Sequence, residues 1–172
     1  MSIQAISFCA LPPNVYRTNP HLLSGPRPSY ADLKELKKEG VKLVVDLRST
    51  ESRYYPYIEK LRCFWLGIKH VRRPMKLKNS LPEKTIFEEI AKRISKNKKQ
   101  TYIHCISGRH RTGVTTGAVN ILNEKTAVDD SINIMKEHGF FQTRLTLTDQ
   151  ERSKRIAMLT KRLEEFKKMF GV

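Results

Sequence analysis

Short apolar runs alternate along the chain with longer stretches in which apolar residues recur every three or four positions. The first pattern predicts buried strands, and the second predicts helices that bury one face. Val41–Leu47 is the clearest strand, because a nearly continuous apolar run is typical of a central parallel strand covered on both faces. Thr101–Ile103 predicts a second buried strand. Shorter candidates are Asn14–Arg17, His21–Ser24 and Ile68–Arg72.

Helix start and stop signals lie between these strands. Ser29 and Asp32 form a capping pair, and Gly40 is placed to end the helix that follows. Residues 80–83 (SLPE) predict a capping box with proline in the first helical turn. Further helices are expected over Ser52–Cys63, where the pattern is irregular, over Thr112–Leu122, over Thr126–His138 with Gly139 as its stop, and after Thr148.

Helical spacing also predicts which side chains face the core. The expected inward positions are Leu33, Leu36, Ile86, Ile90, Ile94, Val128, Ile132, Met135, Ile156, Leu159, Leu163 and Phe166. The tyrosines at positions 54, 55 and 57 are expected to pack in the core or at its rim rather than to stack on nucleic-acid bases.

This alternation of strands and helices predicts an α/β fold, with a central mostly parallel β-sheet flanked by helices. A chain of 172 residues is long enough to bury a real core, so we expect one domain over residues 1–172. Residues 1–13 are expected to form an N-terminal tail or edge strand, and residues 146–170 a C-terminal helix.

The cysteine content and the N-terminal residues indicate the cellular compartment. Three cysteines without a C-x-x-C pair argue against a disulfide framework or a zinc site and favour a reducing compartment. Cys9 and Cys63 are therefore expected to be packing residues, although one of them protecting Cys105 as a disulfide stays open. The apolar stretch Ile3–Leu11 is too short for a membrane span and lacks the basic start of a signal peptide, so a cytoplasmic protein is expected.

Charge adds an expectation about partners. The chain carries 33 basic and 17 acidic residues, a net charge of +16. Eleven of the basic residues and only three of the acidic ones lie between positions 69 and 99. Lys92–Lys99 can be a solvated helix end, but Arg73, Lys76 and Lys78 follow a strand and are candidate substrate contacts. Such a basic rim binds polyanions; RNA is a possible partner, although the aromatic interleaving of single-strand binders is absent.

The segment between the strand Thr101–Ile103 and the helix Thr112–Leu122 predicts a specific chemistry. A loop that leads from a strand into a helix N-terminus presents free backbone N–H groups and the positive end of the helix dipole, which hold phosphate. Cys105 lies where a thiolate would be stabilised, and Arg111 can offer two donors to phosphate oxygens. The expected phosphate loop between them is Ile106, Ser107, Gly108, Arg109 and His110, with Gly108 at positive φ.

These residues resemble a known family. His104-Cys105, five further residues and Arg111-Thr112-Gly113 resemble the signature loop of the cysteine-dependent protein tyrosine phosphatases, in the compact dual-specificity branch. The resemblance implies a dual-specificity-phosphatase-like fold, Cys105 as nucleophile, Arg111 as phosphate ligand, Thr112 as the hydroxyl that helps the cysteine leave, and His104 as loop support. A structural loop with a chance spacing is the alternative.

The second half of the loop is more particular. Gly108–Gly113 (GRHRTG) resembles the plant and fungal atypical dual-specificity phosphatases, some of which cleave inositol pyrophosphates, and their bacterial relatives. The resemblance covers roughly residues 14–140 and is weak outside the loop. It implies catalysis without a metal or another cofactor.

One departure from that family bears on the substrate. Most members carry a general-acid Asp about thirty residues before the Cys, but residues 67–81 contain no Asp or Glu, and Leu77 or Lys78 fills the expected place. Either another acid serves or the leaving group needs little help. Glu83, Asp149 and His110 are candidates for a displaced acid, although a histidine between two arginines is expected to be neutral.

A tyrosine leaving group, with a pKa near 10, gains much from a proton donor, whereas a phosphate leaving from a phosphoanhydride needs less. We therefore expect a phosphatase that favours a densely phosphorylated substrate, such as an inositol phosphate or pyrophosphate. The alternatives are a phosphotyrosine phosphoprotein phosphatase with a displaced acid, an RNA 5′-triphosphatase, and a phosphate-binding module without turnover. Arg48 either contacts substrate or braces the signature loop.

Overall fold

The computed structural model describes residues 11–49, 54–78, 81–82, 84–96, 99–139 and 148–171. Five strands form one sheet in the order β1-β2-β7-β3-β4. Their bounds are β1 Tyr16–Asn19, β2 Leu22–Gly25, β7 Thr101–His104, β3 Leu43–Asp46 and β4 Lys69–Arg72. Strand β1 is antiparallel to β2, and the other pairings are parallel, so the sheet is mostly parallel, as predicted.

The register of the sheet decides what lies at its edge. Strand β7 is central, and its last residue, His104, pairs with Gly25 on β2 and with Asp46 on β3. Asp46 in turn pairs with Arg72 at the end of β4. The carboxyl ends of four neighbouring strands therefore meet at one edge, which is where open parallel sheets bind their ligands.

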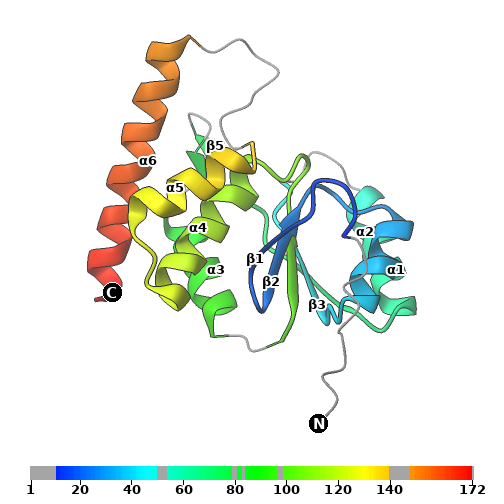
Figure 1. Ribbon diagram of the computed structural model, residues 1–172. Helices are drawn as coiled ribbons and strands as arrows, with labels where there is room; N and C mark the ends of the chain where they lie inside the picture. The colour runs from blue at the N-terminus through cyan, green and yellow to red at the C-terminus, as the bar shows by residue number, and fades with distance from the viewer. Residues whose placement is uncertain are drawn as a thin grey trace.

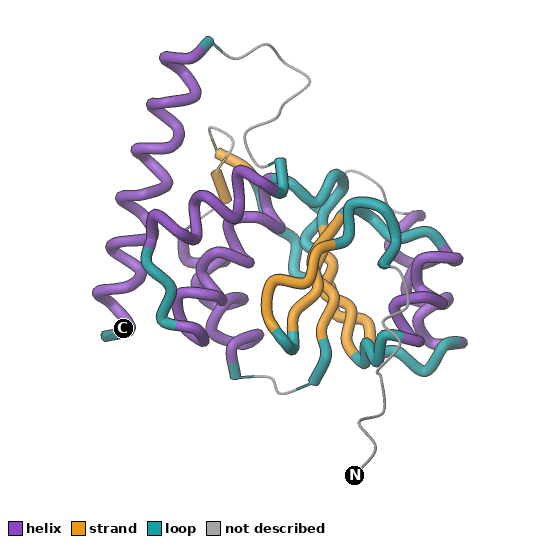
Figure 2. The backbone as a smooth tube through the Cα atoms, in the orientation of Figure 1, coloured by secondary structure: helices purple, strands orange, loops and turns teal. Residues whose placement is uncertain are grey.

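Helices cover both faces of the sheet (Figures 1 and 2). Helices α1 (Tyr30–Lys38) and α2 (Tyr54–Trp65) lie on one face. The other face carries α3 (Lys84–Ser95), α4 (His110–Glu124), α5 (Val128–Glu137) and α6 (Asp149–Phe170). Each face has its own core, and side chains of β7 contribute to both: Tyr102 packs with the α1 and α2 side, and Ile103 with the α4 side.

Most of the predicted helices and core positions are confirmed. Both capping boxes that the structure describes form, at Ser29 with Asp32 and at Thr148 with Glu151. Among the expected inward positions, Leu33, Leu36, Ile90, Ile94, Val128, Ile132, Met135, Leu159, Leu163 and Phe166 are buried, and Ile156 is partly buried against them. The side chain of Ile86 lies outside the described residues.

Two expectations are wrong. Leu81–Pro82 is not the first turn of a helix but a short strand, β6, antiparallel to β5 (Leu77–Lys78); α3 begins at Lys84. Ser80 and Glu83 lie outside the described residues. The helix expected over Ser52–Cys63 forms as α2, which spans Tyr54–Trp65. Of the three tyrosines expected to pack, Tyr57 is exposed, because the inward face of α2 is formed by other residues, and the side chains of Tyr54 and Tyr55 lie outside the described residues.

The ends of the chain agree with the expectation as far as they are described. Helix α6 spans Asp149–Phe170, close to the expected C-terminal helix. Residues 11–13 form no strand, and residues 1–10, which include Cys9, lie outside the described residues. Among the helices described, none combines the length and apolar character that crossing a bilayer requires.

Candidate active site

The predicted phosphate loop lies at the carboxyl edge of the sheet. Strand β7 ends at His104, Cys105 follows it, and α4 begins at His110. Cys105 is 2% exposed, whereas Ile106 and Ser107 reach the surface. The N-cap residue of α4, Arg109, makes no side-chain cap hydrogen bond. The first amides of a helix have no partner within it, so this end of α4 is a ready anion-binding site next to the thiol.

Gly108 fixes the shape of this loop. Its φ is +76°, in the left-handed region that favours glycine. A Cβ on Gly108 would lie 2.7 Å from both the Gly25 carbonyl oxygen and the Pro26 nitrogen. The backbone of the segment Gly25–Arg27 therefore packs directly against the loop. Two hydrogen bonds secure it: the Arg27 N–H donates to the Ile106 carbonyl at 3.0 Å, and the Tyr102 hydroxyl donates to the Pro26 carbonyl at 2.6 Å.

Arg111 and Thr112 lie in the first turn of α4 and are buried. One Arg111 terminal nitrogen donates to Ser49 Oγ at 3.3 Å, which connects the helix to the segment after β3. The Arg111 Nε and the Thr112 hydroxyl are buried without a hydrogen-bond partner. Buried polar atoms are nearly always paired, and a phosphate held in the loop would supply an acceptor for the Arg111 donor.

Glu59, on the inward face of α2, is the centre of a buried network behind the loop. Its Oε1 lies 2.9 Å from His104 Nε2 and 2.9 Å from His70 Nε2. Its Oε2 accepts from Arg48 at 2.9 Å. Arg48 also donates to both oxygens of Asp46, at 2.8 and 2.9 Å. One carboxylate thus joins α2 to β4, to the end of β7 and to the segment that follows β3.

The state of Glu59 follows from these partners. Burial by itself would raise the pKa of its carboxyl group, but hydrogen bonds from His104 and His70 and the positive charges of His104 and Arg48 lower that pKa to about 2. Glu59 is therefore ionised at all ordinary pH values and acts as an acceptor towards both histidines.

This network holds the residue before Cys105. His104 donates from Nε2 to the Glu59 carboxylate, and its Nδ1 lies 3.0 Å from the Cys105 carbonyl oxygen, a second acceptor. The two contacts hold the imidazole ring in one orientation next to the thiol.

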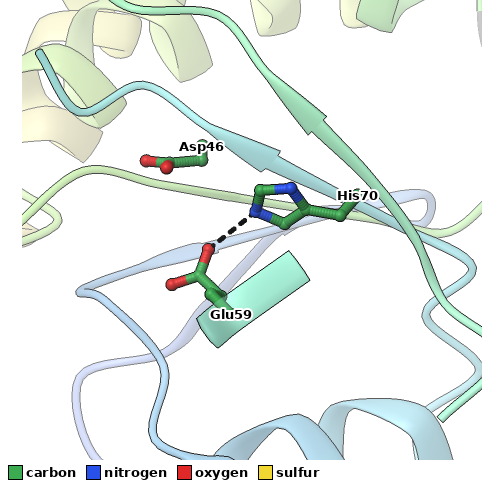
Figure 3. A group of neighbouring side chains, drawn as sticks. All are labelled: Asp46, Glu59 and His70. Carbon is green, nitrogen blue, oxygen red and sulfur yellow. Dashed lines mark hydrogen bonds and ion pairs between the residues drawn. The ribbon is translucent and has the colours of Figure 1, made fainter. Parts of the chain in front are cut away.

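Asp46, Glu59 and His70 also resemble a metal site, because one ligand atom of each lies within 4.8 Å of the others (Figure 3). Their contacts argue against that use. The Arg48 guanidinium already bonds to both carboxylates, so a metal ion would meet a positive charge there. The donor set is better explained as an ion-pair network than as a metal centre.

The residues predicted to contact substrate lie in different environments. The Arg48 side chain is turned into the Asp46 and Glu59 network and is 6% exposed, which fits a brace rather than a substrate contact. Arg73 is partly buried and donates to the Arg72 carbonyl, and Lys76 is exposed. Lys78 lies in β5, and its side chain is outside the described residues.

The predicted acid candidates have different environments. Burial lowers the pKa of His110, and the nearby charges of Arg155, Arg109 and Arg111 lower it further, so His110 is neutral at pH 7, as expected. Asp149 is exposed and 3.7 Å from Arg152 in the first turn of α6. Glu83 lies outside the described residues. The two carboxylates that the contacts place behind the loop, Asp46 and Glu59, are both ion-paired.

Cys63 is a packing residue, as predicted. It is fully buried in the core between the sheet and α1 and α2, whereas Cys105 belongs to the core on the opposite face. Burial raises the pKa of the Cys63 thiol to about 12, with a smaller contribution from the Glu59 charge.

A cleft of about 280 Å³ adjoins the loop. Ser107, Gly108 and Arg109 form one wall, and Asn14 and Pro26 belong to its lining. The rings of Tyr16 and His138 stack at its side, 4.0 Å between centroids. This cleft could not be predicted from sequence patterns, because its lining comes from four separate segments.

Comparisons with known proteins identify a family and a fold for this chain. Residues 23–125 match the family described as polymorphic toxin system, DSP-PTPase phosphatase. A search of curated proteins finds no match.

Solved structures share the fold at low sequence identity. The core catalytic domain of the PP-IP phosphatase SIW14 from S. cerevisiae, in complex with citrate, is 17% identical, with 93% of this chain and 92% of that chain covered and a TM-score of 0.69. P. aeruginosa TpbA, as a cysteine-to-serine variant with phosphotyrosine, is 14% identical, with 98% and 99% covered and a TM-score of 0.69. A putative phosphatase from Shewanella putrefaciens CN-32 is 17% identical, with 89% and 93% covered and a TM-score of 0.64.

We predict that Gly108→Ala distorts the loop. The added Cβ would collide with the backbone of Gly25–Pro26, and positive φ adds strain, so turnover of a small phosphate ester should fall at least tenfold, by a rough estimate for misplaced catalytic groups. Gly67→Ala is the matched control, since Gly67 has a φ of +66° but open space around its Cβ position. Steady-state kinetics of both variants check this. Equal turnover in the two variants would contradict the claim that close packing against Gly25–Pro26 sets the shape of the loop.

We predict a pH-dependent effect of Glu59→Gln. Because folding lowers the pKa of Glu59 from 4.5 to about 2, its ionised form stabilises the fold fully above pH 4.5, and this contribution is lost as the pH falls towards 2. At pH 7 the variant should lose on the order of 3 kcal/mol of unfolding free energy. Urea titrations from pH 7 to pH 3 should show the difference from wild type shrinking.

Glu35→Gln provides the control for this measurement, because Glu35 pairs with Lys38 at the surface. Exposed pairs contribute about 0–1 kcal/mol, so this variant should stay close to wild type throughout. A Glu59→Gln difference that is equally large at pH 3 and pH 7 would refute the charged network.

Proposed function

Since the chain belongs to the DSP-PTPase phosphatases of polymorphic toxin systems, we propose that it hydrolyses phosphate groups through a phosphocysteine on Cys105 and prefers a densely phosphorylated substrate. An inositol phosphate or pyrophosphate fits this description. One observation carries the proposal: the buried Cys105 lies between the uncapped N-terminus of α4 and a histidine whose two nitrogens both face acceptors.

The proposed reaction has two displacements at phosphorus. The Cys105 thiolate attacks, the S–P bond forms, and the bond from phosphorus to the leaving oxygen breaks. Water then attacks the phosphocysteine, the S–P bond breaks, and the proton of that water passes to solvent or to the leaving phosphate. Arg111 and the loop amides stabilise the charge on the three equatorial oxygens. The Thr112 hydroxyl, buried without a partner, is available to the departing sulfur.

The charge around the loop supports a polyanionic substrate. The positive charges of Arg155, Arg109 and Arg111 all act on His110 and lower its pKa, so each of the three guanidinium groups lies near this loop residue. Arg155 comes from α6, far from the loop in sequence. A substrate with several phosphates would interact with more than one of these cations, whereas a single phosphotyrosine needs chiefly the loop itself.

The state of the candidate proton donors also supports a densely phosphorylated substrate. Within the described part of the chain, Asp46 and Glu59 are committed to Arg48 and the histidines, and His110 has lost its proton at neutral pH. A phosphoanhydride releases a weakly basic phosphate, which needs little protonation. The cleft beside Ser107–Arg109 offers room for the part of the substrate that is not transferred.

Other expectations remain proposals of the same kind. We place residues 1–172 in one phosphatase domain that works without a metal, in a reducing, cytoplasmic compartment.

The test is a turnover assay without metal on three substrates: inositol pyrophosphate, phosphotyrosine peptide and 5′-triphosphorylated RNA. We expect kcat/KM for the pyrophosphate to exceed that for the peptide at least tenfold, a modest part of the roughly 10²- to 10⁴-fold that a proton donor supplies. Cys105→Ser should lower turnover on every substrate about a thousandfold or more, because oxygen replaces the thiolate. Cys63→Ser is the matched cysteine control and should keep the wild-type preference.

The three substrates separate the alternatives. A preference for the peptide would mean that another acid serves and that the substrate argument is wrong. A preference for RNA that weakens steeply with salt would indicate a triphosphatase instead. Unchanged hydrolysis in Cys105→Ser would refute the phosphocysteine mechanism.

A further inference from the structure

Helix α2 is apolar on the side that faces away from the protein as well as on parts of the side that faces in. Its inward residues, Pro56, Glu59 and Cys63, are buried. Its outward side carries five large apolar side chains at the helical spacing i, i+1, i+4, i+7 and i+8, and we call it the outer α2 face: Tyr57, Ile58, Leu61, Phe64 and Trp65.

These side chains are unusually accessible. Phe64 is 73% exposed and Trp65 is 78% exposed. Of the eight large hydrophobic side chains exposed in the described part of the chain, five form the outer α2 face. Single exposed apolar residues are normal, but a continuous apolar strip on a surface helix marks an interaction site.

The charges around the strip are positive. Lys60 and Arg62 are exposed on the same helix, and the only acidic residue of α2, Glu59, points into the buried network. Arg62 lies over the ring of Tyr30 on neighbouring α1, 5.8 Å from its centroid, and Lys34 lies 5.2 Å from the same centroid. The strip is therefore bordered by cations.

We propose that the outer α2 face docks on an anionic phospholipid surface. Aromatic and aliphatic side chains flanked by Lys and Arg are the pattern of helices that lie in the membrane interface, where the rings enter the acyl boundary and the cations meet lipid phosphates. The net charge of +16 acts in the same direction. A second copy of the chain fits less well, because a two-fold contact would bring Lys60 and Arg62 against their own counterparts.

The geometry allows this docking without blocking the active site. With 12 residues, α2 is about 18 Å long, far too short to cross a bilayer core of about 30 Å, so it would lie along the surface. Helices α1 and α2 cover one face of the sheet, opposite α3 to α6 (Figure 1). The phosphate loop lies at the edge between the two faces, so it would stay open to solvent.

Trp65 makes the test direct, because it is the only tryptophan in the chain. Its fluorescence is measured with phosphatidylcholine vesicles, with and without phosphatidylserine, and with lipids brominated on the acyl chain. We expect a blue shift and quenching only where phosphatidylserine is present, weakened by salt. Leu61→Ser/Phe64→Ser, which keeps the reporter, should lower vesicle affinity at least tenfold, by a rough estimate from the apolar area lost.

Two controls separate docking from misfolding. Met169→Ser removes an exposed apolar side chain on α6 and should bind like wild type. Both the double variant and Met169→Ser should hydrolyse a small soluble phosphate ester at the wild-type rate, since neither change touches the loop. Lys60→Gln/Arg62→Gln should weaken binding to the anionic vesicles.

Three outcomes would overturn the proposal. One is the absence of vesicle binding. The second is binding without a change in Trp65 emission, which would mean that net charge acts elsewhere on the surface. The third is a dimer in sedimentation equilibrium that Leu61→Ser/Phe64→Ser dissociates, with Trp65 emission responding to protein concentration rather than to lipid, which would assign the face to a second copy.

Discussion

The structure depends on one buried carboxylate. Glu59 accepts hydrogen bonds from His104 and His70 and forms an ion pair with Arg48, and so ties α2 to β7, to β4 and to the segment after β3. A buried charge is tolerated only when it is fully paired. Here the pairing fixes the relative positions of helix and strands, which local backbone preferences do not determine. The residue before Cys105 is thereby held in one place, and with it the start of the phosphate loop.

The remainder of the site is assembled from backbone. Parallel strands bring His104, Gly25 and Asp46 to one edge, and α4 begins immediately beyond it. The close approach of Gly108 to the Gly25–Pro26 backbone sets the path of the loop between Cys105 and Arg111. The amides are oriented before substrate arrives, so charge on a transferring phosphoryl group needs little reorganisation.

The parts of the site that could be predicted from the sequence are those encoded within a few residues. Cys105, Gly108 and Arg111 lie in one short loop between a strand and a helix, and that order alone predicts a phosphate cradle. Glu59 could not be found in the same way, because it meets His104 across 45 positions. Its only local signal is a single acid on the inward side of an otherwise apolar helix face. The exposure of Tyr57 could not be predicted for a related reason. Helix α2 is apolar on two sides, and helical periodicity alone does not tell which of the two sides is buried. At Leu81–Pro82 the local signal was misleading. The sequence there is typical of a helix start, but the two residues pair with β5 as a strand.

The central claim is that the phosphoryl group passes through the Cys105 sulfur. The most direct measurement is a rapid acid quench of the wild-type protein during its first turnover of a small aryl phosphate, followed by mass spectrometry of the peptide that contains Cys105. The account predicts one phosphoryl group on the Cys105 sulfur, formed before product release and absent from Cys105→Ser. A wild-type protein that turns over at full rate with no phosphorylated cysteine, or with the phosphoryl group on another residue, would contradict it.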